Sequence, residues 1–103
     1  MRAVIVVKTK MDIDGVDTAI DQWDQMFSEC IRRNVQVVGR IVTTAGFKDV
    51  ARKVKKQDKT KEFDLLVLYS PHQYTERKQE YIDFVKEMQE LFNVKVVAVR
   101  SKF

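Results

Sequence analysis

The sequence is poor in the residues that cross-link, break or anchor a chain. Its 103 residues include one Cys, one Pro and three Gly. A single cysteine, Cys30, cannot form an internal disulfide, which argues against a disulfide-stapled secreted scaffold. No apolar run approaches the roughly 20 residues that a bilayer-spanning helix needs, and Ala3 to Val7 is too short for a signal-peptide core. We therefore expect a cytoplasmic protein with no membrane partner.

Motifs for nucleotides and metals are missing as well. Neither G-x-G-x-x-G nor G-x-x-x-x-G-K-[ST] occurs, so no glycine-rich loop brings the backbone close to phosphates. With one cysteine and one histidine, His72, the chain cannot assemble a tetrahedral zinc site. An oxygen-ligand site from Asp12, Asp14 and Asp17 is conceivable, but these residues lack the 12-residue spacing of an EF-hand. We expect no cofactor and no metal.

What the chain does have is a regular alternation of apolar patterns. The hydrophobic fraction is 45%, and the length fits one α/β domain, residues 1–103. Short apolar runs predict strands at 3–7, 35–42, 63–69 and 94–99. Between them, apolar residues at helical spacing predict helices from about 16 to 33, from about 47, and from about 75 to 92. This order predicts a three-layer α/β fold, with a mainly parallel four-stranded sheet and helices on both faces.

The apolar stripes of these helices are interpreted as core. The first consists of Ala19, Trp23, Met26, Phe27, Cys30 and Ile31, and the last of Tyr81, Phe84, Val85, Met88, Leu91 and Phe92. Asn34 and Asn93 follow these helices where a left-handed residue ends a helix. A docking patch around Tyr81 to Phe92, or on the last strand, is the alternative interpretation.

Charge is distributed unevenly along the chain. The segment 48–61 carries two acids and seven basic residues, for a local charge of +5: Lys48, Arg52, Lys53, Lys55, Lys56, Lys59 and Lys61. The net charge of the chain is +4, so the rest sums to 4 − 5 = −1. A block between Asp12 and Glu29 holds six acids and no basic residue. The basic block is either a nucleic-acid or acidic-partner surface, or a solvated helix face. Pairing of the two blocks between copies would give a weak homo-oligomer.

Active-site chemistry has few candidates. In an open α/β sheet, sites form beyond the carboxyl ends of strands, here the loops 8–15, 43–46 and 70–75. Asp12-Ile-Asp14-Gly-Val resembles the D-x-D-G-[TV] loop of haloacid-dehalogenase-type phosphatases, but four residues separate it from the first strand. The acids fit better as residues favouring the start of the next helix. Ser70 and His72 lack a third triad member, and Ser70 fits turn chemistry beside Pro71.

Together the segments resemble the catalytic domain of the serine recombinases, over essentially the whole chain. The matching segments are Arg2-Ala-Val-Ile-Val-Val-Lys-Thr-Lys10, Thr18-Ala-Ile-Asp-Gln22, Arg33-Asn-Val-Gln-Val-Val, Glu62-Phe-Asp-Leu-Leu-Val-Leu-Tyr69 and Leu91-Phe-Asn-Val-Lys-Val-Val-Ala-Val. The resemblance implies a resolvase-like fold. It also implies a chemistry in which a serine attacks a DNA phosphodiester while arginines stabilise the charge on phosphorus.

The positions that would carry this chemistry are substituted. By the resemblance, the nucleophile falls on Lys10 and a preceding arginine on Lys8, and the D-R-L-S-R motif falls on His72, Gln73, Tyr74, Thr75 and Glu76. Only Gln22 matches, and the arginine-bearing segment after the second strand is missing. A protonated amine cannot replace a serine alkoxide, and a carboxylate repels phosphate.

We therefore expect a non-catalytic serine-recombinase-like domain, linked to mobile-element or phage DNA recombination, that acts as a binding or regulatory module. Its partner would be DNA, a recombinase or another copy of itself. The sequence ends before the family's long dimerisation helix and DNA-binding domain, which fits this expectation. The alternatives are electrostatic nucleic-acid binding through the 48–61 block, and residual recombinase or nuclease activity using Ser70 or Tyr69.

Overall fold

A computed structural model describes residues 1–9, 13–58 and 63–100. Strands and helices alternate along these residues, with a single 3₁₀ turn (η1) before the last helix. Their bounds are β1 Arg2–Lys8, α1 Ile13–Arg32, β2 Gln36–Thr43, α2 Phe47–Asp58, β3 Leu65–Leu68, η1 Pro71–Gln73, α3 Lys78–Phe92 and β4 Lys95–Ala98. The predicted order of strands and helices is confirmed.

The four strands form one parallel sheet in the order β2-β1-β3-β4. Ala3 of β1 lies opposite Val37 of β2 on one side and Leu65 of β3 on the other. The register between β1 and β2 shifts after Ala3, so that Val4 lies opposite Gly39. Val38 of β2 is therefore an extra residue in this pairing, as in a β-bulge.

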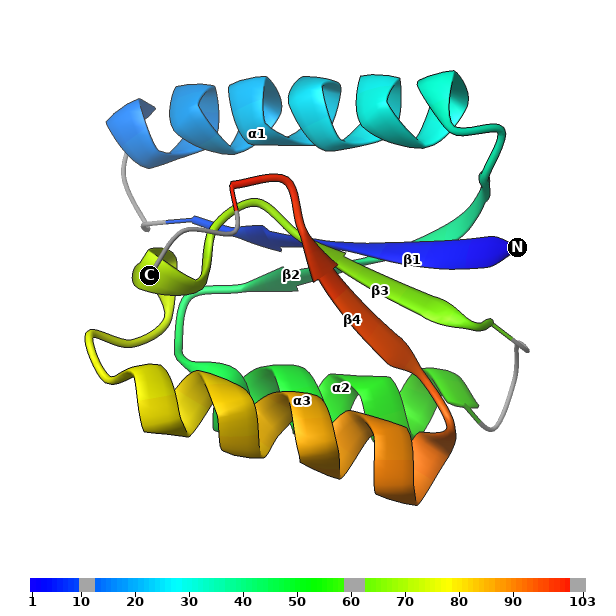
Figure 1. Ribbon diagram of the computed structural model, residues 1–103. Coiled ribbons are helices and arrows are strands. Elements are labelled where there is room, and N and C mark those ends of the chain that lie inside the picture. Colours follow the sequence, from blue (N-terminus) through cyan, green and yellow to red (C-terminus); the bar gives the residue numbers. More distant parts are fainter. Residues whose placement is uncertain (10–12, 59–62, 101–103) are drawn as a thin grey trace.

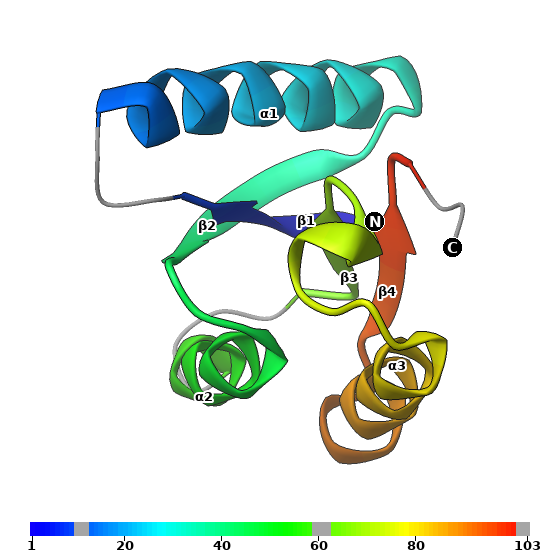
Figure 2. The same ribbon diagram turned by 90° about the vertical axis from the view of Figure 1, so that its left-hand side faces the viewer.

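Helices cover both faces of the sheet (Figures 1 and 2): α1 lies on one face, and α2 and α3 lie side by side on the other. Because side chains alternate along a strand, β1 contributes to two cores. Val4 and Val6 pack with residues of α2 and α3, whereas Ala3, Ile5 and Val7 pack with α1. Burial on both faces explains why β1 is a continuous apolar run.

The ends of two helices follow the sequence prediction. Asn34, which follows α1, has a φ of 58°, and Asn93, which follows α3, has a φ of 56°. Both lie in the left-handed region, where asparagine is tolerated better than most residues. Asn93 N–H donates to Gln89 O at 3.1 Å and thereby satisfies a carbonyl of the last turn.

Three residues that the periodicity assigned to the core are exposed. Phe27 and Ile31 of α1 are 37% and 63% exposed, and Leu91 of α3 is 66% exposed. Each lies at the edge of its helix's apolar arc, beyond the residues that touch the sheet. Met26, Cys30, Phe84 and Met88 of the same stripes are buried as predicted.

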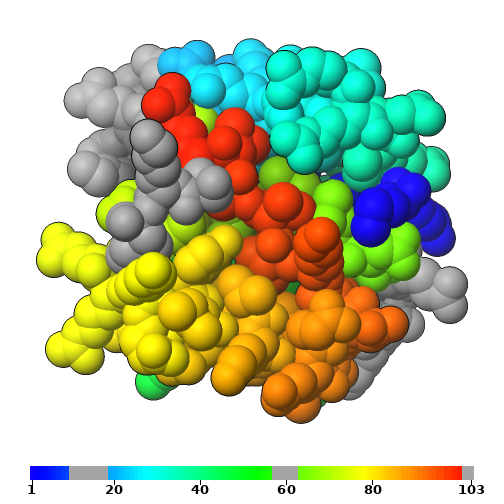
Figure 3. All heavy atoms as spheres, in the orientation of Figure 1, coloured from blue at the N-terminus to red at the C-terminus, as the bar shows by residue number. Residues whose placement is uncertain are grey.

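Two helix starts also differ from the prediction. The first helix begins at Ile13 rather than near residue 16, and α3 begins at Lys78 rather than near residue 75, because η1 occupies the start of that loop. The edge strand β4 is partly exposed between α3 and the end of α1, as the space-filling view shows (Figure 3). No helix within the described residues has the length and apolarity to cross a membrane.

Candidate functional site

Three of the loops that leave the carboxyl ends of strands gather at one edge of the sheet. The strands β1, β2 and β3 are parallel and end at Lys8, Thr43 and Leu68, so the residues that follow them share this edge. Thr9 N–H donates to Thr43 O at 2.9 Å and joins two of the loops. The chain connects β1 to β2 over one face and β2 to β3 over the other, so the order reverses between β1 and β3. In open α/β sheets, ligands bind at this switch point.

Lys8 lies at the switch point, but it is engaged by the protein itself. Its ammonium group donates a hydrogen bond to the backbone carbonyl of Gln73 in η1. The same Nζ atom lies 5.6 Å from the ring centroid of Tyr74, within range of a cation–π contact. Lys8 therefore ties the end of β1 to the loop after β3. Of the positions that the recombinase resemblance singled out, these contacts bring together Lys8, Gln73 and Tyr74.

Three buried polar atoms lack a hydrogen-bond partner among the described residues: Gln22 Oε1, Gln73 Oε1 and Tyr74 Oη. Gln22 is only 4% exposed, on the sheet side of α1. Each unpaired buried group costs on the order of 1–3 kcal/mol. Burial raises the pKa of the Tyr74 phenol well above its usual range, so this hydroxyl is neutral at pH 7. The group therefore remains a potential hydrogen-bond donor.

The polar residues of the loop after β3 are used to build the loop. Ser70 Oγ accepts a hydrogen bond from the backbone N–H of His72 at 3.3 Å and so caps η1. This contact is to the backbone of His72 and not to its imidazole, so it does not form the nucleophile–base pair that a triad requires. Thr75 Oγ1 accepts from Arg77 N–H at 3.0 Å and donates to Glu80 at 2.5 Å. His72 and Glu76 are exposed in this segment.

A polar network joins the end of β2 to α2. Thr43 is buried, and its hydroxyl donates to Asp49 Oδ2 at 2.7 Å while accepting from Ala45 N–H at 3.1 Å. Asp49 also pairs with Arg52 at 2.5 Å and with Lys53 at 3.1 Å. The hydrogen bond from Arg52, with those from Thr43 and Lys53, holds the pKa of Asp49 far below its ordinary value. Sequence reasoning missed this network, although an aspartate in the first turn of a helix is a recognisable signal.

We expect Asp49→Asn to lower the thermal unfolding midpoint at pH 7, because the amide cannot pair with two cations. The folded-state pKa of Asp49 is depressed, so its contribution is complete above the unfolded-state value of about 3.9 and is lost as the pH falls further. Circular-dichroism melts should therefore show a difference from wild type at pH 5 to 7 that shrinks towards pH 2. Asp83→Asn, on the exposed side of α3, is the control. A difference that does not change with pH would contradict this role for Asp49.

The α2 basic surface consists of five residues of the predicted basic block: Lys48, Arg52, Lys53, Lys55 and Lys56. The opposite side of α2 packs against the sheet through Val50 and Val54. Lys48, Lys55 and Lys56 are exposed, and no ion pair joins them to an acid among the described residues.

The other two cations of this surface are partly neutralised. Arg52 and Lys53 both pair with Asp49, and Lys53 also donates to the backbone carbonyl of Val42 at 2.6 Å. Their charges are therefore less available to a ligand than those of the three unpaired lysines. Lys59, Lys61 and Lys10, which the sequence analysis also named, lie outside the described residues, as does Asp12.

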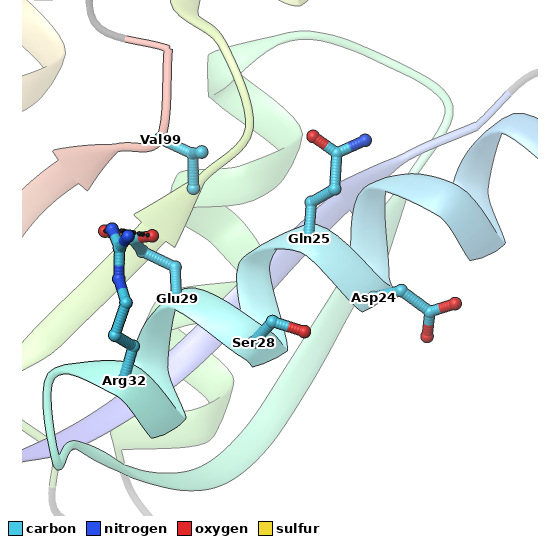
Figure 4. A pocket seen from close by; sticks show the side chains of 6 residues that line it. All are labelled: Asp24, Gln25, Ser28, Glu29, Arg32 and Val99. Atoms are coloured by element: carbon cyan, nitrogen blue, oxygen red, sulfur yellow. Dashed lines mark hydrogen bonds and ion pairs between the residues drawn. The ribbon is translucent and has the colours of Figure 1, made fainter.

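The structure also contains surface grooves that the sequence did not indicate. One, of about 400 Å³, runs between α1 and the end of β4, and its lining includes Gln25, Ser28 and Glu29 (Figure 4). Arg32 pairs with Glu29 at 2.5 Å in this groove, and their hydrogen bond is the main reason that the pKa of Glu29 is lowered. A larger groove of about 590 Å³ separates α2 from α3.

The described residues hold no cluster of three His, Cys, Asp or Glu that could bind an ion. The side chains of Asp14 and Asp17 are not among those described.

Comparison with family models, with curated proteins and with solved structures finds no match to this chain.

Proposed function

We propose that this chain is a non-catalytic module with a serine-recombinase-like fold, and that it binds nucleic acid through the α2 basic surface. The observation that carries the proposal is the set of exposed lysines, Lys48, Lys55 and Lys56, which form no ion pair with an acid among the described residues. Lysines on a solvated helix face contact phosphates without reading sequence. We therefore expect binding that is strong at low salt and has little sequence preference.

The spacing of these lysines supports contact with more than one phosphate. Lys48 and Lys55 are separated by two turns on the same side of α2, which corresponds to about 10 Å along the helix axis. Lys56 adjoins Lys55, and Arg52 lies one turn from each end of this row. The arrangement presents several charges to one anionic surface rather than a single point charge.

The non-catalytic part of the proposal rests on the carboxyl edge of the sheet. The ammonium group of Lys8 already donates a hydrogen bond to Gln73 O and contacts the Tyr74 ring. Transfer of a phosphoryl group needs planar, permanently charged donors around the phosphorus, and the described loops at this edge place no arginine at the matching motif positions. The parallel sheet is consistent with the resolvase-like resemblance, from which we infer a regulatory or binding role in DNA recombination.

Chemical-shift mapping tests where nucleic acid binds. A ¹⁵N-labelled sample titrated with a random-sequence duplex at about 50 mM salt should show its largest amide shifts between Lys48 and Lys56. Shifts confined to residues 8–9 and 70–75 would contradict the α2 surface, and the absence of any shift would contradict nucleic-acid binding. A covalent protein–DNA adduct on a denaturing gel would contradict the non-catalytic part.

A further inference from the structure

The groove between α2 and α3, which lie side by side in Figure 2, is lined by three aromatic residues. Phe47 is the first residue of α2, Tyr74 directly follows η1, and Phe84 lies in α3. The ring of Phe47 stacks on Tyr74 with centroids 5.0 Å apart and on Phe84 with centroids 4.3 Å apart. We call these three residues the aromatic lining. Phe47 and Tyr74 are only partly buried, so the groove offers accessible apolar surface.

The size of this groove suits a small molecule. Its volume is about 590 Å³, which lies within the range of about 300–1,000 Å³ that small-molecule sites occupy. Its lining is mainly apolar, with a few charged side chains at the two sides. A mainly apolar groove with a few charged groups is the usual composition of such a site, and the charged groups then determine which ligand it accepts.

The α3 side of the groove is acidic. Asp83 and Glu87 line it, are exposed, and lie one helical turn apart, which is about 6 Å along the axis. Neither carboxylate forms an ion pair with a basic residue among those that the structure describes. Asp83 accepts a hydrogen bond from the neutral amide of Gln79 at 2.8 Å, which leaves its charge uncompensated. Two carboxylates without a cationic partner therefore border the same apolar groove.

The remaining charged residues of the groove are Glu80 and Lys48. Glu80 accepts a hydrogen bond from Thr75 and lies 3.8 Å from Arg77, so its carboxylate is already engaged by the protein. Lys48 lines the α2 side and forms no ion pair with the described acids opposite. A cationic group in the groove is therefore attracted to the α3 side and repelled from the α2 side.

We propose that this groove binds a linear oligoamine, with its ammonium groups against Asp83 and Glu87 and its alkyl stem on the aromatic lining. Ammonium groups donate charge-assisted hydrogen bonds to carboxylates. The hydrocarbon stem between them packs on apolar surface, as the stem of a lysine side chain does. Ammonium groups joined by a short alkyl chain match carboxylates that are one helical turn apart. An inorganic cation would leave the aromatic lining unused, and an anion would be repelled by both carboxylates.

Spermidine is the probe that tests this site, and hexaamminecobalt(III) is its matched comparator. Both carry three positive charges and donate from N–H groups, but only spermidine has an alkyl stem. Spermidine added to ¹⁵N-labelled protein at low salt should shift amides of residues that line the groove, such as Phe47, Ala51 and Glu87. Its methylene protons should show nuclear Overhauser effects to the ring protons of Phe47 and Tyr74. Hexaamminecobalt(III) should bind more weakly, because it cannot use the aromatic lining.

Two variants with the same net charge, 4 + 2 = +6, locate the carboxylates that matter. Asp83→Asn/Glu87→Gln should bind spermidine about tenfold more weakly than wild type, because it removes both acceptors of the ammonium groups. Asp21→Asn/Asp24→Asn is the matched control, because it neutralises two exposed acids of α1, on the other face of the sheet. This control should bind like wild type, as measured by isothermal titration calorimetry.

The inference is overturned if spermidine shifts no amide of the groove, if both double variants lose affinity equally, or if hexaamminecobalt(III) binds as tightly as spermidine. None of these titrations contains nucleic acid. Failure of the oligoamine site therefore leaves nucleic-acid binding through α2 untouched, and the reverse also holds.

Discussion

Leu66→Ala is expected to destabilise the protein by about 3 kcal/mol, because it leaves a cavity in the core on one face of the sheet. Leu66 lies in the central strand β3, is fully buried, and belongs to the core between the sheet and the helices α2 and α3. In a chain of this size such a loss lowers the unfolding midpoint by on the order of 15 °C. Thermal melts followed by circular dichroism at pH 7 measure it.

Leu91→Ala is the matched control for this cavity. It removes the same atoms from a leucine that is 66% exposed, so we expect a change within about 0.5 kcal/mol. Equal losses for the two variants would contradict the assignment of β3 to the centre of the sheet. The comparison also tests the correction at Leu91, which helical periodicity placed in the core.

Neutralising the three unpaired lysines of α2 is expected to have the largest effect on binding. Each phosphate contact contributes about −0.9 to the slope of log K against log salt on duplex DNA, so three contacts account for about −2.7. At about 50 mM salt the same loss corresponds to a more than hundredfold weaker affinity. Fluorescence anisotropy with a labelled duplex measures both quantities. The α2 variant carries Lys48→Gln, Lys55→Gln and Lys56→Gln.

A second variant separates position from net charge. It replaces three exposed lysines outside α2, and it brings the net charge to the same 4 − 3 = +1: Lys78→Gln, Lys86→Gln and Lys95→Gln. If binding depends on the α2 basic surface, this variant should keep the wild-type slope. If binding reflects only the overall charge, the two variants should lose affinity equally.

The strands and the helix ends could be predicted because their signals are local. The run from Ala3 to Val7 is apolar at every position, which only a strand buried on both faces requires. Asn34 and Asn93 adopt the left-handed conformation that their places after apolar stripes predicted. The register shift at Val38 and the 3₁₀ turn at Pro71 were not predicted. The first depends on how two distant strands pair, and the second is held by local hydrogen bonds of Ser70 and Tyr74.

Burial at the margins of the helices could not be predicted from periodicity. On α1 the apolar arc extends from Met26, which faces the sheet, to Ile20 and Ile31, which face solvent. The arc is wider than the contact that one helix makes with a sheet, and a sequence does not reveal where that contact ends. Gln22, a polar residue, lies within the buried part of the arc.

The candidate site was predicted in outline only. The loops at the carboxyl edge and the cations of α2 were named from the sequence. The sequence did not predict that Lys8 donates a hydrogen bond to Gln73 O, or that Asp49 forms ion pairs with Arg52 and Lys53. These contacts depend on where the backbone places the side chains. Those contacts decide which cations remain available, and they reduce the predicted basic block to three unpaired lysines on the described part of α2.

The most direct test of nucleic-acid binding through α2 is one salt titration of wild type and the two lysine variants against the same duplex. We predict that the slope of log K against log salt becomes shallower by about 2.7 for the α2 variant, and that it stays at the wild-type value for the variant at Lys78, Lys86 and Lys95. Equal slopes for all three proteins, or no binding by wild type at about 50 mM salt, would contradict the claim.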